Sequence, residues 1–189
     1  STVGHFFYGI KKNATMETTL IEVNEAAKKA NLPPFGYFLI DSFWYAESYV
    51  PKPKGGYANG YKGTWRWDPA IAKENNMFPS GLKSLRNALG APFVMHMGMW
   101  VGSGKKASPG GPPPYALNAS WNWTVEENAS IPTPGTAGAN RFWDWLFGTM
   151  AASGLDTYKQ DHQENQLPQT NYLLQTPGAQ EIWLREMAT

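Results

Sequence analysis

Apolar residues along the chain fall into two patterns: short continuous runs, and longer stretches in which they recur at helical spacing. Continuous runs of strand length are typical of strands buried on both faces, whereas apolar positions three and four apart indicate amphipathic helices. The runs that predict strands are 4–10, 37–45, 92–100 and 155–161. The stretches that predict helices are 15–30, 80–90 and 140–154, followed by a last helix that begins near Pro177.

This alternation predicts an α/β fold in which parallel strands are joined by right-handed crossovers. No G-x-G-x-x-G segment follows the first strand, so a dinucleotide-binding fold is not indicated and no cofactor is predicted. The pattern fits a (β/α)8 TIM barrel, with residues 1–189 as its N-terminal half of about four βα units. Four units do not close a barrel, and an open half exposes strand edges. We therefore expect the remainder of the barrel from the same polypeptide or from a partner chain.

The segments that follow the second and third strands are rich in polar residues, Gly and Pro, and they are predicted to be loops. The longer one, 101–139, contains three N-x-S/T acceptor sequences for glycosylation, and a fourth lies near the start of the chain. The acceptor residues are Asn13, Asn118, Asn122 and Asn128. Three acceptors clustered in one loop, in a chain that begins with Ser1, predict a secreted or lumenal glycoprotein.

The composition excludes some classes of function. A net charge of +1 provides no basic face for the phosphates of nucleic acid, so no nucleic-acid partner is predicted. The sequence contains no apolar run of about 18 residues, so no membrane span is predicted. Nine Trp and an aromatic fraction of 14% suit a carbohydrate site, but packing in a core accounts for them equally simply.

The fourth predicted strand ends with Lys159 and Asp161, close to the point where the chain leaves the sheet. TIM barrels carry their active sites at the carboxyl ends of their strands, so a carboxylate in this position is a candidate for catalysis. A neighbouring lysine would keep Asp161 ionised and nucleophilic. A structural alternative is that Asp161 caps the following segment while Lys159 lies at the edge of the core. Spacing alone does not decide between the two.

A resemblance to a known family favours the catalytic interpretation. The segments "YFLIDSFW", "WRWDP", "MFPSGLKSLRNALGAPFVMHMGMWV" and "FWDWLFGTMAASGLDTYKQD" resemble the retaining α-galactosidases and the related raffinose-synthase-like enzymes. The resemblance covers approximately residues 35–161, and its most specific parts are F-P-S-G-L-K and a K-x-D at the end of the fourth strand. It implies a TIM-barrel glycoside hydrolase that acts on α-linked galactosyl or related sugars.

The resemblance also implies roles for individual residues. Asp161 resembles the nucleophile that forms the glycosyl-enzyme intermediate, and Lys159 resembles the lysine that donates a hydrogen bond to the sugar beside it. Asp41 resembles the first of two aspartates that hold sugar hydroxyls, and Trp44 resembles a tryptophan that stacks on the sugar ring. Further residues that the resemblance adds to the substrate pocket are Trp65, Asp68 and Trp100.

Retaining hydrolysis requires two carboxyl groups about 5–5.5 Å apart. In this family the second, the acid/base, comes from a later strand and is not in this sequence. Glu164 is too close in sequence to face Asp161 across a sugar, and Asp144 lies in a predicted helix. The chain also departs from the family where two adjacent aspartates are usual, because it has Asp41-Ser42, and serine cannot provide a charge-assisted hydrogen bond. Gln160 is a smaller departure at a position that is usually apolar.

A metal site is the remaining chemical alternative, since Asp161, His162 and Glu164 lie close together in sequence. Adjacent residues on an extended segment point to opposite faces, and the chain has three His and no Cys, so no metal is predicted. His96 is predicted to be a buried histidine of the third strand. Overall, the sequence predicts a retaining glycoside hydrolase with a carbohydrate substrate. The alternative is a non-catalytic carbohydrate-binding or structural glycoprotein built on a degenerate hydrolase barrel.

Overall fold

The chain forms two compact units in the computed structural model. The structure describes residues 14–41, 44–50, 61–67, 69–70, 77–103 and 113–188. The first unit is made of Ser1–Tyr45, Asp68–Met97 and Gly148–Lys159, and the second of Ala46–Trp67, Gly98–Phe147 and Gln160–Thr189. The strand predicted at 4–10 lies outside the described residues.

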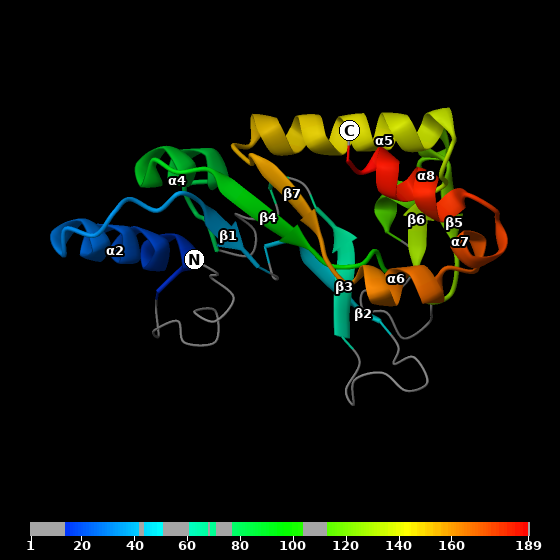
Figure 1. Cartoon of the computed structure of the whole chain (residues 1–189), viewed down its shortest axis with the longest axis horizontal. Helices are drawn as coiled ribbons and strands as arrows, with labels where there is room; N and C mark the ends of the chain where they lie inside the picture. The colour runs from blue at the N-terminus through cyan, green and yellow to red at the C-terminus, as the bar shows by residue number, and fades with distance from the viewer. Residues whose placement is uncertain are drawn as a thin grey trace. The chain divides into compact units, whose positions relative to one another are not determined.

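In the part of the first unit that the structure describes, two helices accompany a three-stranded sheet in the order β1-β4-β7. Figure 1 shows β4 between β1 and β7, with the arrowheads of β4 and β7 pointing the same way. The elements are α2 (Met16–Lys29), β1 (Phe38–Ile40), α4 (Leu82–Leu89), β4 (Phe93–Met97) and β7 (Thr157–Gln160), whose last residue begins the second unit.

The pairing of β1 with β4 is parallel, with Phe38 opposite Phe93 and Ile40 opposite Met95. All four side chains are buried, and the rings of Phe38 and Phe93 meet edge to face with their centroids 6.5 Å apart. The predicted α/β fold with a parallel sheet is therefore confirmed. A closed barrel is not shown, and it stays a prediction.

Helix α2 forms where its sequence predicted it. Its start is fixed by a capping box, in which the Thr15 side chain accepts from the backbone N–H of Thr18 and the Thr18 side chain accepts from that of Thr15. Its apolar face buries Met16, Leu20 and Ala27, whose spacing places them on one side of the helix.

Two of the predicted strands differ from the structure. The run 37–45 was expected to be one strand, but β1 ends at Ile40, and the buried residues Trp44 and Tyr45 lie in a bend. The run 155–161 was expected to be buried on both faces, but the residues of β7 alternate between exposed and half-buried. Apolar periodicity reports burial, and a buried bend produces the same continuous run as a buried strand.

Asp156 connects α4 to β4 within the first unit. Its carboxylate accepts hydrogen bonds from Arg86 Nε at 2.8 Å, from Arg86 Nη2 at 2.6 Å and from the backbone N–H of Phe93 at 2.9 Å. The hydrogen bond from Arg86 is the main reason that the pKa of Asp156 lies below its usual value of 3.8, and the bond from Phe93 contributes in the same direction. The ionised form is therefore the one that the fold stabilises.

We expect Asp156→Asn to lower the free energy of unfolding at pH 7 by about 1 kcal/mol, since solvent screens this partly exposed pair. Because the folded-state pKa is lowered, the ionised Asp156 stabilises the fold above its ordinary pKa of 3.8 and ceases to do so as the pH falls through the folded-state value. Urea unfolding of both proteins at pH 7 and at successively lower pH measures this. If the difference in unfolding free energy between the unaltered protein and Asp156→Asn stays constant as the pH falls through the acid range, the predicted role of the ionised Asp156 is contradicted.

The second unit contains short elements around an aromatic core. Its strands are β2 (Ala46–Val50), β3 (Tyr61–Arg66), β5 (Trp123–Val125) and β6 (Ser130–Pro132). Its helices are η1 (Pro114–Leu117), η2 (Ala119–Trp121), α5 (Ala137–Ala152, whose last turn belongs to the first unit), α6 (Gln163–Gln169), α7 (Asn171–Gln175) and α8 (Ala179–Glu186). None of the helices in the described residues is long and apolar enough to cross a membrane.

Both of the predicted loops contain secondary structure. The segment after β1 includes an antiparallel ribbon of β2 and β3, and the predicted loop 101–139 includes η1, η2 and the antiparallel pair β5-β6. All three residues of β6 are buried, although the sequence there is rich in Pro, Thr and Gly. The sequence did not predict these short elements, because polar residues and Pro were given more weight than the tertiary burial that overrides them.

Trp100 lies at the centre of the aromatic core. Its ring meets those of Tyr115, Trp123 and Phe142 edge to face, with centroids 5.6 to 5.8 Å apart, a favourable geometry for aromatic pairs. The Tyr115 hydroxyl donates to the backbone oxygen of Trp67 and accepts from its backbone N–H, which connects this core to the end of β3.

Gly102 lies against the backbone of the segment that leads into β6. A Cβ atom at this position would lie 2.4 Å from the Glu127 oxygen and 2.5 Å from both the Ala129 nitrogen and the Glu126 oxygen. All three are backbone atoms, so no side-chain rotation relieves the overlap. The close approach of the two backbones therefore requires glycine.

We expect Gly102→Ala to destabilise the protein by about 3 kcal/mol, the upper part of the range for overpacking. Gly148→Ala is the matched control. Gly148 is exposed within α5, and apart from its chain neighbours and the nearby backbone of its own helix no atom lies within 4 Å of its Cβ position, so a gain of roughly 0.5–1 kcal/mol is expected from helix propensity. Thermal or urea unfolding measures both. Equal stabilities for the two variants would contradict the close contact at Gly102.

Candidate functional site

In the first unit the predicted site residue Asp41 lies directly after β1. Because Ile40 pairs with Met95 in the parallel register, Asp41 is level with His96 on β4. The Asp41 Oδ1 and His96 Nδ1 atoms are 3.5 Å apart. The side chain of Asp41 is 37% exposed, whereas that of His96 is 3% exposed. Asp41 therefore presents a partly exposed carboxylate at the carboxyl end of the sheet, and the buried imidazole of His96 lies next to it.

Sequence reasoning treated His96 only as a buried core histidine and did not connect it with Asp41. Burial is confirmed, but the strand register also makes His96 a neighbour of a predicted sugar-binding carboxylate. Knowing which residues of the two strands pair would have revealed this, and no sequence pattern specifies that register.

Trp44 belongs to the same group. Its indole Nε1 donates to the backbone oxygen of His96 at 2.6 Å, and the residue has no exposed surface. A ring with no exposed face is not available to stack on a sugar in this conformation. The role of Trp44 in a substrate pocket stays a prediction, whereas its hydrogen bond to the His96 backbone attaches it to β4. Lys159 lies in β7 and is exposed.

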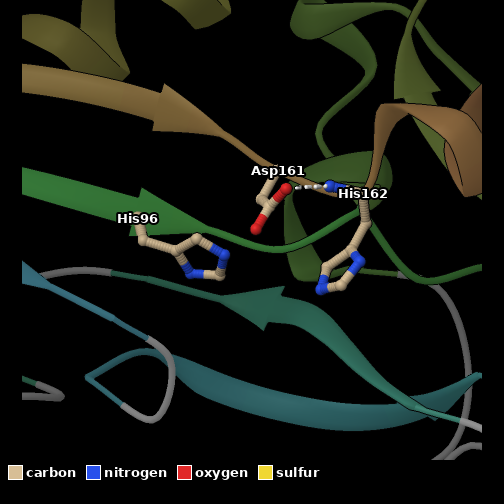
Figure 2. A group of neighbouring side chains, drawn as sticks. All are labelled: His96, Asp161 and His162. Carbon is tan, nitrogen blue, oxygen red and sulfur yellow. Dashed lines mark hydrogen bonds between the residues drawn. The ribbon is translucent and has the colours of Figure 1, made fainter. Parts of the chain in front are cut away.

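In the second unit, Asp161 follows the last residue of β7. Its Oδ1 atom accepts a hydrogen bond from the backbone N–H of His162 at 2.9 Å, and Asp161 is half-buried. His162 adopts a left-handed conformation with φ 57° and is the N-cap residue of α6. Figure 2 shows this hydrogen bond, with Asp161 and His162 on the segment that follows β7 and His96 on β4.

Gln160 holds the backbone before α6. Its Nε2 atom donates to the backbone oxygen of Gly98 at 2.9 Å and to that of Asp161 at 3.1 Å. A polar residue at this position, noted in the sequence as a departure from the family, thus links the end of β7 to the residue after β4. The sequence showed that Gln160 is an unusual polar residue at this position, but it did not show that Gly98 is its hydrogen-bond partner.

These contacts bear on the structural alternative for Asp161. The carboxylate accepts a hydrogen bond from the backbone N–H of the next residue, but the N-cap residue of α6 is His162 and no side chain caps this helix, so the capping alternative stays a prediction. A single backbone hydrogen bond to Oδ1 leaves the role of the carboxylate in catalysis as a prediction. Glu164, excluded on sequence grounds as a partner, is exposed, and its Oε1 atom lies 3.5 Å from His162 Nδ1.

Two of the remaining predicted pocket residues, Trp65 and Trp100, belong to the second unit. Trp100 is fully buried in the aromatic core, and Trp65 is half-buried against a buried apolar cluster of Met99, Val101 and Ala129. Asp68 lies outside the described residues, as do Ser42 and the acceptor Asn13. The assignment of these residues to a substrate pocket stays a prediction, as does the absence of a metal.

A surface cavity of about 390 Å³ is present in the second unit, and none of the predicted site residues lines it. It is lined by Asn140, Trp143, Asp144, Arg185 and Glu186. Burial raises the pKa of Glu186, and the hydrogen bond from the backbone N–H of Gly135 opposes this. Asp144 lies in α5 and lines this cavity, so its predicted position in a helix is confirmed.

No model of a known protein family matches the chain, and no curated protein matches it. Among solved structures, a Bacillus halodurans C-125 protein described as a "putative alpha-N-acetylgalactosaminidase" is similar, with a TM-score of 0.47 and 20% identity. The alignment covers 93% of this chain and 43% of that one, so the chain spans less than half the length of that protein.

Proposed function

We propose that the chain is part of a glycoside hydrolase that acts on α-galactosides or related α-linked sugars with retention of configuration. The observation that carries the proposal is the position of the K-x-D segment. Asp161 immediately follows a strand that neighbours β4, and β4 pairs in parallel with β1, which Asp41 immediately follows. Carboxylates at the carboxyl ends of parallel strands are the usual placement of catalytic groups in α/β barrels.

In the proposed reaction, an Asp161 carboxylate oxygen attacks the anomeric carbon of the sugar. The bond between that carbon and the glycosidic oxygen breaks, and a second carboxyl group protonates the departing oxygen. Water, deprotonated by the same second group, then attacks the anomeric carbon and releases Asp161. Lys159 donates a hydrogen bond to the sugar beside the nucleophile, and Asp41 accepts hydrogen bonds from sugar hydroxyls.

A specific observation favours a second candidate function. The chain has Ser42 where the family usually has a second aspartate, and no carboxylate of this sequence has been assigned as the acid/base. A serine hydroxyl binds a sugar hydroxyl more weakly than a carboxylate does. The second candidate is therefore a non-catalytic carbohydrate-binding or structural glycoprotein that retains the hydrolase architecture.

Covalent trapping tests the proposal and separates the two candidates. The whole protein is incubated with an α-galactoside carrying fluorine at C2 and a good leaving group, which slows breakdown of a glycosyl-enzyme intermediate. Proteolysis and mass spectrometry then locate the bound sugar. Labelling of the peptide that contains Asp161 is expected. Labelling elsewhere would overturn the assignment of the nucleophile. Sugar binding without turnover of any α-glycoside would favour the second candidate.

A further inference from the structure

The three glycosylation acceptors in the second unit differ in their surroundings. We propose that Asn118 is the principal N-glycan acceptor among Asn118, Asn122 and Asn128, and that Asn128 carries no glycan. The proposal requires the chain to enter the secretory pathway, and it does not rest on hydrolase activity. It follows from where the amide and the hydroxyl of each acceptor sequence lie in the folded unit.

Asn118 and its sequon hydroxyl, that of Ser120, are both exposed. The Asn118 Oδ1 atom accepts from the backbone N–H of Ser120 at 3.0 Å and from its hydroxyl at 2.7 Å. The backbone N–H is a donor only, so the atom facing it is the side-chain oxygen. An N-glycan is attached to the other atom, the amide nitrogen. The turn that holds Asn118 is thus retained when the sugar is present.

The residues before Asn118 fix its position at the surface. Tyr115 is buried, and the short helix η1 that contains it ends at Leu117. Leu117 is 75% exposed, the largest exposed fraction among the exposed large hydrophobic side chains of the described residues. A sugar on the neighbouring asparagine would be placed to cover this apolar side chain. Glycans occupy exposed surface positions of this kind because they are bulky and strongly hydrated.

Asn122 is exposed, but its Cβ and Cγ atoms are closely packed against Gly138. It has a left-handed backbone conformation with φ 47°, and its Cβ and Cγ atoms would lie 2.8 and 2.9 Å from a Cβ placed on Gly138. Its side chain therefore lies against the first turn of α5. The hydroxyl of Thr124, which completes this sequon, is part-buried and lies 2.9 Å from the Thr133 hydroxyl in a hydrogen bond. Both features disfavour this site relative to Asn118.

Asn128 is the least accessible of the three acceptors. It is half-buried, and the two residues that follow it in the sequon, Ala129 and Ser130, have no exposed surface. Ala129 forms an antiparallel bridge with Val101, and Ser130 is the first residue of β6. A chain modified at Asn128 would have to accommodate a bulky hydrated group beside a segment that the fold buries.

The modification itself is a group transfer with a defined balance. The Asn118 amide nitrogen attacks the anomeric carbon of a lipid-linked oligosaccharide diphosphate. The new bond joins nitrogen to that carbon, the bond from carbon to phosphate oxygen breaks, and the lipid diphosphate leaves. The amide loses one proton to a base of the transferring enzyme. No oxidant or reductant is needed.

The test is to direct the chain into the secretory pathway of a eukaryotic host with a signal peptide. Occupancy at each site is measured from the intracellular and secreted pools by peptide mass spectrometry after enzymatic deglycosylation in heavy-oxygen water, which marks each modified asparagine. The variants are Asn118→Gln, Asn122→Gln and Asn128→Gln. Ser120→Ala is a further variant that keeps Asn118 and the backbone N–H at position 120 while removing the sequon hydroxyl.

We expect the highest occupancy at Asn118 and unmodified peptide at Asn128. Asn118→Gln and Ser120→Ala should each remove most of the glycan mass from this region, whereas Asn128→Gln should leave it unchanged. Occupancy at Asn122 or Asn128 above that at Asn118 would overturn the proposal, and so would the absence of glycan from all three sites. Because occupancy is read from peptides, it is independent of whether the protein hydrolyses any sugar.

Discussion

Replacing Asp161 by Asn in the whole protein is expected to abolish turnover of α-galactosides, with a fall in kcat of roughly 10⁴-fold or more, as is typical when a covalent nucleophile is removed. The amide of asparagine is not nucleophilic enough to displace the leaving group. The fold should be unaffected, because the asparagine Oδ1 atom can still accept the hydrogen bond that Asp161 Oδ1 accepts from the His162 backbone N–H at 2.9 Å.

Glu164→Gln is the matched control for this experiment. Glu164 is an acidic residue three positions after Asp161, and its side chain is 70% exposed. Glu164→Gln removes one negative charge, as Asp161→Asn does. Turnover should be retained in this variant. Steady-state kinetics of both variants, together with sugar binding measured by calorimetry, separate the outcomes. If Asp161→Asn keeps its activity, Asp161 is not the nucleophile. If the unaltered protein binds sugar without turnover and the variant binds equally well, the non-catalytic candidate is favoured.

Replacing Trp100 by Ala is expected to lower the free energy of unfolding by about 3–5 kcal/mol, the range for truncating a fully buried large aromatic side chain. Trp100 has no exposed surface, and three aromatic rings surround it with centroids within 5.8 Å. Truncation leaves a cavity that these rigid rings cannot fill. A loss of this size is a large part of the total stability of a domain, so part of the protein should unfold at 37 °C.

Trp121→Ala is the control for this prediction. Trp121 contacts the same cluster through Tyr115, Phe142 and Trp145, but it is only half-buried, so a smaller loss of stability is expected. Urea unfolding followed by circular dichroism measures both variants. The experiment also tests the role that the sequence assigned to Trp100. If Trp100 lined a substrate pocket, the variant would raise KM with little change in stability, which is the opposite of the result expected here.

The sequence predicted those parts of the fold that depend on local signals. Helix α2 was predicted from its apolar spacing, and its observed bounds, Met16–Lys29, lie within the predicted 15–30. The positions of β4 and β7 followed from short apolar runs between helices. The parallel arrangement followed from the alternation of the two patterns, since a parallel connection requires a crossover.

The candidate site was predicted only as single residues at strand ends. Asp41 and Asp161 could be selected because strand ends are recognisable and because the surrounding motifs resemble a family. The residues that lie beside Asp41 and Asp161 in the folded protein could not be predicted from the sequence. His96 lies beside Asp41 because Ile40 pairs with Met95, and the Gln160 side chain donates a hydrogen bond to the Gly98 backbone, 62 residues away in the chain.

By itself, then, the amino-acid sequence determined the class of fold, the helix within residues 15–30, the strand ends that bear carboxylates and the positions that a glycan could occupy. Only the tertiary structure decided which of these positions are accessible. In the structure Trp44, Trp100 and Ser130 are buried and Asn118 is exposed. Segments that were predicted to be loops contain strands. The physical reason is that capping and periodicity act over a few neighbouring residues, whereas burial and strand register depend on contacts between residues far apart in the chain.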